Sequence, residues 1–120
     1  MSTGADFWGV IVAEELQSPL SIMREQALLL GGKTRNLIEA RVDTSTYQDD
    51  FVHHFKLVIP TLDAYTYELF RVIQSMDLYP VTAEGKVCKN EEEFTEWLRV
   101  RLSDPKTTGT IGRLLTMVRA

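Results

Sequence analysis

The sequence predicts an α+β domain in which helices at both ends of the chain pack on an antiparallel sheet of three to four strands. Apolar residues recur every three or four positions near both ends of the chain, and they alternate with polar residues from about residue 37 to 60. The 120 residues, 44% hydrophobic and 25% charged, have the composition of a globular chain with one core. We therefore expect one domain over residues 1–120, in the order α-α-β-β-β-(β)-α-α.

Two helices are expected before the sheet. The first is predicted over residues 5–16, where the helical period would place a wide apolar stripe on one side. A second helix should begin at Ser18-Pro19, because a serine side chain can cap free amides and proline suits the first helical position. It is expected to end at the glycine pair Gly31-Gly32.

The middle of the chain has the period of two that is typical of strands. Residues 37–44 predict a half-buried strand, and a loop over 45–50 would connect it to a core strand over 51–60. Successive side chains of a strand point to opposite faces. His53 therefore falls among the apolar residues of the second strand, and His54 falls on its other face.

The segment 62–76 fits either a helix or a strand. Its apolar spacing suits a helix, whereas its tyrosine, threonine, phenylalanine and valine residues favour a strand. We take the strand as the preferred interpretation. A shorter strand is expected at about 78–83, where Pro80 would suit the edge of a sheet.

Two helices are predicted in the last third of the chain. Asn90 is placed to cap the first one, and Glu93 at its third position gives a capping-box arrangement. Asp104-Pro105 repeats the start signal for a last helix. Gly109 and Gly112 each cost this helix about 1 kcal/mol relative to alanine, so it should depend on tertiary packing.

Six short segments carry a resemblance to a known group of proteins: residues 24–27, 30–34, 69–72, 78–81, 91–94 and 102–107. In these segments the chain from Ser18 onward resembles a family of small uncharacterised bacterial proteins. The resemblance implies a bacterial cytosolic protein with a strand near Leu69. It implies no activity and no functional residue.

Composition excludes several classes of function. The net charge is −4, and no basic stripe is present, so nucleic acid is not an expected partner. Cys88 is the only cysteine, which excludes an internal disulfide and fits the cytoplasm. The apolar stretch 7–13 is followed by Glu14 and Glu15, and no stretch reaches the about 18 apolar residues that cross a bilayer. No membrane association is therefore expected.

One cluster has the residue types of a divalent metal site: Asp49, Asp50, His53 and His54. Because neighbouring strand residues face opposite ways, His53 and His54 could not readily share one metal ion, whereas Asp50 and His54 could. A third ligand could come from Glu39 or Asp43 on the partner strand. In the alternative interpretation, His53 is a core histidine with a hydrogen-bond partner, and His54 lies on a solvated face. We assign no metal or other cofactor.

Two further motifs have simpler structural explanations. Gly32-Lys33-Thr34 looks like the end of a phosphate-binding loop, but here the glycines are expected to end a helix, whose exposed carbonyls repel phosphate. The lysines at 86 and 89 could lower the pKa of Cys88. The sequence places no base beside this thiol, so a half-buried structural cysteine is expected.

The preferred hypothesis for function is a non-enzymatic protein–protein interaction module. Its partner would be another protein or a second copy of the chain in a homodimer. Aromatic residues suit such interfaces, and four are candidates: Tyr65, Tyr67, Tyr79 and Trp97. One alternative is an acidic inhibitor or immunity-type protein that neutralises a basic toxin or nuclease. The other is a metal-dependent hydrolase that uses Asp50 and His54.

Overall fold

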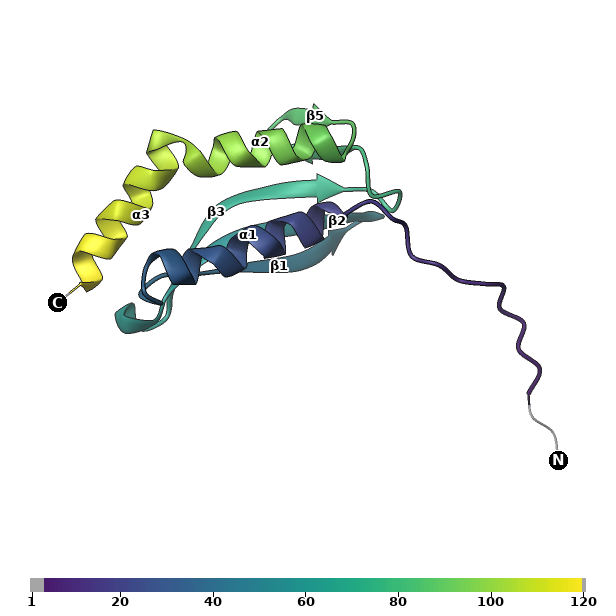
Figure 1. Cartoon of the computed structure of the whole chain (residues 1–120), viewed down its shortest axis with the longest axis horizontal. Coiled ribbons are helices and arrows are strands. Elements are labelled where there is room, and N and C mark those ends of the chain that lie inside the picture. The colour runs from purple at the N-terminus through teal and green to yellow at the C-terminus, as the bar shows by residue number, and fades with distance from the viewer. Residues whose placement is uncertain (1–3, 120) are drawn as a thin grey trace.

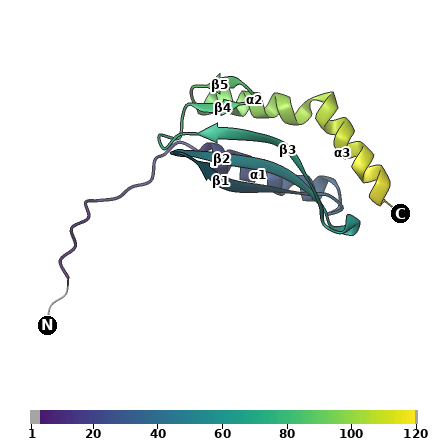
Figure 2. The same ribbon diagram turned by 180° about the vertical axis from the view of Figure 1, so that it is seen from behind.

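Three helices lie on one face of a five-stranded antiparallel sheet (Figure 1). The computed structural model describes residues 4–119. No element of this part of the chain covers the opposite face, which is seen from the front in Figure 2. The elements follow in the order α1 (Pro19–Lys33), β1 (Glu39–Tyr47), β2 (Asp50–Ile59), the 3-10 turn η1 (Pro60–Leu62), β3 (Tyr65–Gln74), β4 (Val81–Ala83), β5 (Lys86–Cys88), α2 (Glu91–Ser103) and α3 (Pro105–Val118).

The sheet is a simple meander in which each strand pairs with the next, so β1 and β5 form its edges. In β2, the odd-numbered residues from His53 to Ile59 point toward the helices and are buried, while the even-numbered ones are half-buried. The core lies between this face and the helices. A larger apolar cluster lies under α1 and α2, and a smaller one beside α3 contains Ile38, Leu57 and Ile59.

The α+β class and the order of helix, strands and helices are confirmed. The segment 62–76 contains strand β3, as its composition favoured. The sheet has five strands rather than three to four, because β4 and β5 form a short hairpin at Glu84-Gly85. Both turn residues have positive φ, as a tight type I′ turn requires. A three-residue strand such as β5 is too short to show a period in the sequence.

The predicted helix over residues 5–16 is wrong. This segment has no helical or strand structure, and all of Gly4–Gln17, which we call the N-terminal arm, is exposed. Gly9 and the β-branched run Val10–Val12 both disfavour a helix. An isolated helix of this length is also marginal in water unless its apolar face packs on another element. Both views show the arm projecting away from the body (Figure 1).

Helix α1 begins as predicted and ends slightly later. The Ser18 side chain accepts a hydrogen bond from the Ser21 amide at 3.1 Å. The helix passes through Gly31-Gly32 to Lys33, and the buried Thr34 closes it. The Thr34 hydroxyl accepts from the Ile38 amide at 3.1 Å and donates to the Ile38 carbonyl at 2.8 Å. Gly32-Lys33-Thr34 is therefore a helix C-terminus that leads into β1.

The two C-terminal helices begin at the predicted caps. The Asn90 side chain accepts from the Glu93 amide at 2.9 Å, and the Glu93 carboxylate accepts from the Lys89 amide at 2.8 Å. The Asp104 carboxylate accepts from the Lys106 amide at 2.7 Å and caps α3. Four apolar residues of α3 pack on the smaller core cluster: Ile111, Leu114, Leu115 and Val118. No helix in residues 4–119 is long and apolar enough to cross a bilayer.

Candidate functional site

The N-terminal arm exposes five large apolar side chains in one short segment. The exposed fractions are 94% for Phe7, 79% for Trp8, 95% for Val10, and 78% for both Ile11 and Val12. Contiguous apolar surface of this kind usually marks an interaction site in a folded protein. The arm is thus the first candidate for a functional segment.

The base of the arm is fixed to the body through Gln17. Its carbonyl accepts a hydrogen bond from the Tyr79 hydroxyl at 2.8 Å, and its amide donates to the Glu91 carboxylate at 2.9 Å. Its side-chain amide donates to the Glu25 carboxylate at 2.6 Å. Three separate parts of the fold, namely α1, α2 and the loop before β4, therefore set the point at which the arm leaves the body.

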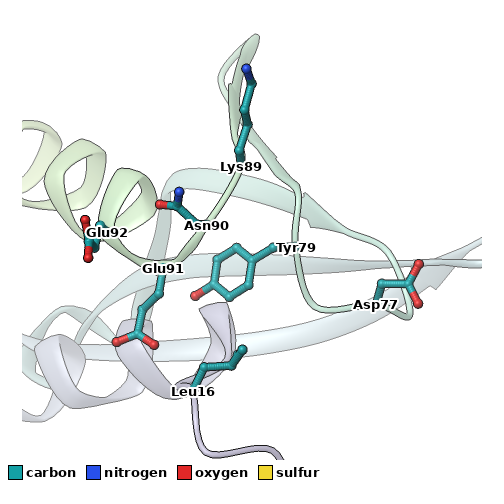
Figure 3. A pocket seen from close by; sticks show the side chains of 7 residues that line it. All are labelled: Leu16, Asp77, Tyr79, Lys89, Asn90, Glu91 and Glu92. Carbon is teal, nitrogen blue, oxygen red and sulfur yellow. The ribbon is translucent and has the colours of Figure 1, made fainter.

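An open hollow of about 470 Å³ adjoins this anchor (Figure 3). The Tyr79 ring lies above Leu16, and Glu91 lies beside its hydroxyl. Burial, reinforced by the negative charge of Glu91, raises the pKa of Tyr79 to about 12. Tyr79 therefore stays a hydrogen-bond donor to the arm. The lining residues include three carboxylates and one lysine: Leu16, Asp77, Tyr79, Lys89, Asn90, Glu91 and Glu92.

The structure places His53 in the core with both ring nitrogens paired. Its Nδ1 accepts from the Thr44 hydroxyl at 2.9 Å, and its Nε2 donates to the Gln74 side-chain carbonyl at 2.8 Å. Burial lowers the pKa of His53, because a charged imidazolium would lose its hydration there. A neutral ring satisfies both contacts, so His53 has the role of a buried structural residue.

His54 lies on the open face of the sheet in a row of polar side chains. Its Nε2 lies 2.9 Å from the Ser45 hydroxyl, and its Nδ1 lies 2.6 Å from the Glu68 carboxylate. Arg71 binds the other oxygen of Glu68 at 2.9 Å. Although burial raises the pKa of Glu68, the hydrogen bonds from His54 and Arg71 outweigh it, and the pKa is lowered.

The order serine, histidine, carboxylate is that of a hydrolase triad. Catalysis of that kind also needs donors for the oxyanion and a concave site that holds the substrate. Ser45, His54 and Glu68 line neither the hollow beside Tyr79 nor the one beside Arg101. They lie instead on three neighbouring strands, and we interpret them as a cross-strand hydrogen-bond network that stabilises the sheet.

The predicted ligand pair, Asp50 and His54, is not brought together, although Asp43 is the cross-strand partner of His54. Asp50 begins β2 and pairs with Tyr47, four positions or roughly 13 Å along the strand from His54. Asp43 is engaged with Lys56, whose hydrogen bond, with the charge of Arg41, lowers the pKa of this carboxyl. Within residues 4–119 no group of three or more ligating side chains could hold a metal ion.

Cys88 is buried at the end of β5. Burial raises its pKa and outweighs the opposite effect of Lys86. The expectation that neighbouring lysines could favour the thiolate is therefore not met. A protonated, enclosed thiol is a poor nucleophile.

The four aromatic candidates lie in three different settings. Tyr79 anchors the arm, whereas Tyr65 and Tyr67 are exposed at the start of β3. Trp97 packs edge-on against Phe70 and stacks on Phe94, with ring centroids at 5.2 and 6.0 Å. Trp97 is thus part of the core edge.

A second hollow lies between β3 and the junction of α2 with α3. It is lined by cationic and hydroxyl side chains and by no carboxylate: Tyr67, Leu69, Arg101, Pro105, Lys106, Thr107, Thr110 and Arg113. Arg101 is already engaged, because it donates to the Leu69 carbonyl at 2.9 Å and to the Glu84 carboxylate at 2.7 Å. At this hollow Arg101 therefore ties α2 to the sheet.

The chain matches no protein-family model, no curated protein and no solved structure. The resemblance to small bacterial proteins gains no support from these comparisons, and the function has to be inferred from the structure. Sequence reasoning missed the arm, its anchor at Gln17 and the network of His54. For the arm a signal was present in Gly9 and the β-branched residues after it, which favour an extended chain over a helix.

Proposed function

We propose that this protein is a non-enzymatic interaction module that binds a protein partner through its N-terminal arm. The observation that supports this most strongly is the exposure of five large apolar side chains in one short segment, from Phe7 to Val12. Exposing apolar side chains to water is unfavourable in free energy, and a partner that covers them removes this unfavourable contribution.

The size of the effect is sufficient for specific binding. Burying a large apolar side chain contributes roughly 1.5–3 kcal/mol, so the five side chains could contribute on the order of 10 kcal/mol. Association must offset the lost freedom of both partners and the ordering of the arm. The hydrogen bonds that hold Gln17 already fix one end of the arm, which reduces the ordering cost.

A comparison of two matched double variants tests this proposal. Trp8→Ser with Ile11→Ser removes apolar surface from the arm, and Met117→Ser with Leu28→Ser removes exposed apolar side chains from α3 and α1. Affinity capture from the native cell should lose its main partner with the arm variant only. Equal recovery of that partner by the arm variant and the wild-type chain would contradict a role for the arm.

Tryptophan fluorescence gives a second readout. Trp8 is exposed while Trp97 packs in the core, so a Trp97→Phe variant reports on the arm alone. Its emission should shift to shorter wavelength when a partner covers the indole. An unchanged spectrum in the captured complex would place the contact elsewhere on the molecule.

The acidic inhibitor remains a second candidate function, favoured by the hollow at the base of the arm. Asp77, Glu91 and Glu92 line this hollow beside the anchored Gln17, opposite a single lysine. A basic partner would meet them as it bound the arm. Binding of this kind weakens steeply with salt, whereas binding through apolar side chains does not. Salt titration of the captured complex therefore separates the two.

A further inference from the structure

We infer that the partner of the arm is a second copy of this chain, and that the arm adds as a strand to the outer edge of β1 in that copy. This inference rests on the proposed function, since it names the partner and the surface that the arm uses. Two copies would exchange arms reciprocally and form a two-fold symmetric dimer.

The first argument is the free edge of β1. This strand has nine residues and pairs on one side only, with β2. An edge strand of this length presents a row of unpaired N–H and C=O groups, and natural proteins usually shorten or cover such edges. Its last four residues, Thr44–Tyr47, are all exposed. In residues 4–119 of a single copy, no strand fills this position.

The second argument is the chemistry of the arm. Phe7–Val12 is rich in aromatic and β-branched residues, which are typical of strands. Its backbone is not engaged in helix or sheet. The Trp8 amide donates to the Asp6 carboxylate at 3.0 Å. Covering the side chains alone would leave most of the other N–H and C=O groups of this segment without partners away from water. Addition to a sheet edge pairs the backbone and buries the side chains in one step.

The third argument is the direction of the arm. Gln17 is held between Tyr79 and Glu91, at the end of the molecule where β3 finishes and β2 begins. From there the arm runs away from its own body in both views (Figure 2). To reach its own β1 edge it would have to reverse and return along α1. The edge of a second copy can be reached without changing the anchor.

The test begins with the mass of the full chain in solution. Light scattering during size exclusion should give twice the mass of the chain for the wild type and the mass of one chain after deletion of residues 1–13. All described residues of this segment are exposed and outside the core, so the deletion leaves the fold intact. Circular dichroism of the shortened chain checks this.

Two proline variants then distinguish strand addition from non-specific apolar contact. In a strand added at an edge, successive N–H groups point alternately toward the partner strand and away from it. Proline is tolerated only where the N–H faces away. Of Val10→Pro and Ile11→Pro, one should therefore weaken the dimer at least about tenfold more than the other. Val10→Ala and Ile11→Ala are the controls, because they remove similar side chains and keep both N–H groups.

Photo-crosslinking locates the contact. A photoreactive benzoylphenylalanine in place of Trp8, in a mixture of light and isotope-labelled copies, should form a product that joins residue 8 of one copy to residues 39–47 of the other. The same group in place of Met117, which is exposed on α3, should give no such product.

The outcomes separate this inference from the proposed function. A dimer with unequal proline effects and a crosslink to β1 supports the inference. A dimer in which both prolines act equally, or in which residue 8 crosslinks to another surface, overturns the docking site. A monomer whose arm still determines capture of a different protein overturns the inference and leaves the proposed function standing. If the wild-type chain is a monomer and the arm variants capture the same partners as the wild type, the inference and the proposed function are both overturned.

Discussion

His53 shows how one polar residue can be kept inside an apolar core. It is 2% exposed, and its ring lies between Thr44 and Gln74, with one nitrogen accepting and the other donating. A neutral ring satisfies this arrangement, whereas a buried imidazolium would lose its hydration. His53, whose alternative interpretation from the sequence was a core histidine with a hydrogen-bond partner, is therefore a cross-strand link between β1, β2 and β3.

This environment makes stability depend on pH. Burial lowers the pKa of folded His53 below the value of about 6.5 for an unfolded histidine, so the unfolded state takes up the proton more readily. The contribution of His53 is complete above about pH 6.5 and is lost as the pH falls toward the folded pKa. In this window the free energy of unfolding falls as the pH falls, because the unfolded state binds a proton that the folded state does not. Urea unfolding between pH 7.5 and 5 measures it, and a His53→Phe variant should show a smaller slope.

Gln74 should be as important as His53 for the same contact. Replacing Gln74 with Leu removes the acceptor for the buried Nε2–H of His53, and an unsatisfied buried donor costs about 1–3 kcal/mol. The free energy of unfolding should fall by that amount at pH 7.5. Gln26→Leu, at an exposed position of α1, is the control and should change stability little. Equal effects of the two variants would show that the His53 contact contributes nothing.

At the level of elements, Arg101 joins α2 to the sheet and to the start of α3. It donates to the Leu69 carbonyl of β3, forms an ion pair with Glu84 at 2.7 Å, and lies over the Phe70 ring at 5.3 Å. It also bonds the Thr107 hydroxyl. One side chain of α2 thus fixes the position of this helix relative to β3 and to the start of α3.

Arg101→Met should therefore destabilise the fold more than an equivalent change nearby. The methionine keeps part of the packing but leaves the Leu69 carbonyl without its donor, at a cost of about 1–3 kcal/mol. The matched control is Arg99→Met, on the same helix, which loses only an exposed contact to Glu96 and should change stability by less than about 0.5 kcal/mol. Chemical denaturation of both variants compares them directly, and similar losses would argue against the anchoring role.

At the level of the whole molecule, the body and the arm differ in how they are stabilised. The body has its own core, while the arm has large apolar side chains that no part of the described chain covers. If arm exchange occurs, the arm stabilises the protein only in the dimer, and this contribution depends on concentration. A body that folds by itself and an arm that orders on binding would explain this contrast.

Thermal unfolding at several concentrations should show this difference. The Tm of the full chain is expected to rise with protein concentration, because the folded state is linked to dimerisation. The Tm of the chain lacking residues 1–13 should not change with concentration, and it should match that of the full chain at high dilution. A Tm of the full chain that is independent of concentration would indicate that the arm has no partner in a second copy.

The sequence determined the elements whose signals are local. The caps Ser18, Asn90 and Asp104 placed three helix starts correctly, because side-chain hydrogen bonds to the first amides depend only on neighbouring residues. Alternation along residues 51–60 likewise identified β2 and separated His53 from His54. These local signals were enough to predict the α+β class.

Only the tertiary structure decided what depends on distant contacts. The arm has an apolar spacing that fits a helix, but no described part of the chain offers a surface on which such a helix could pack, so the segment forms neither helix nor strand. The partners of His53, the network of His54 and the anchor at Gln17 all join residues that are far apart in the chain. Local propensity carries no information on such pairs, which is why the candidate site became visible only once the sheet and helices were in place.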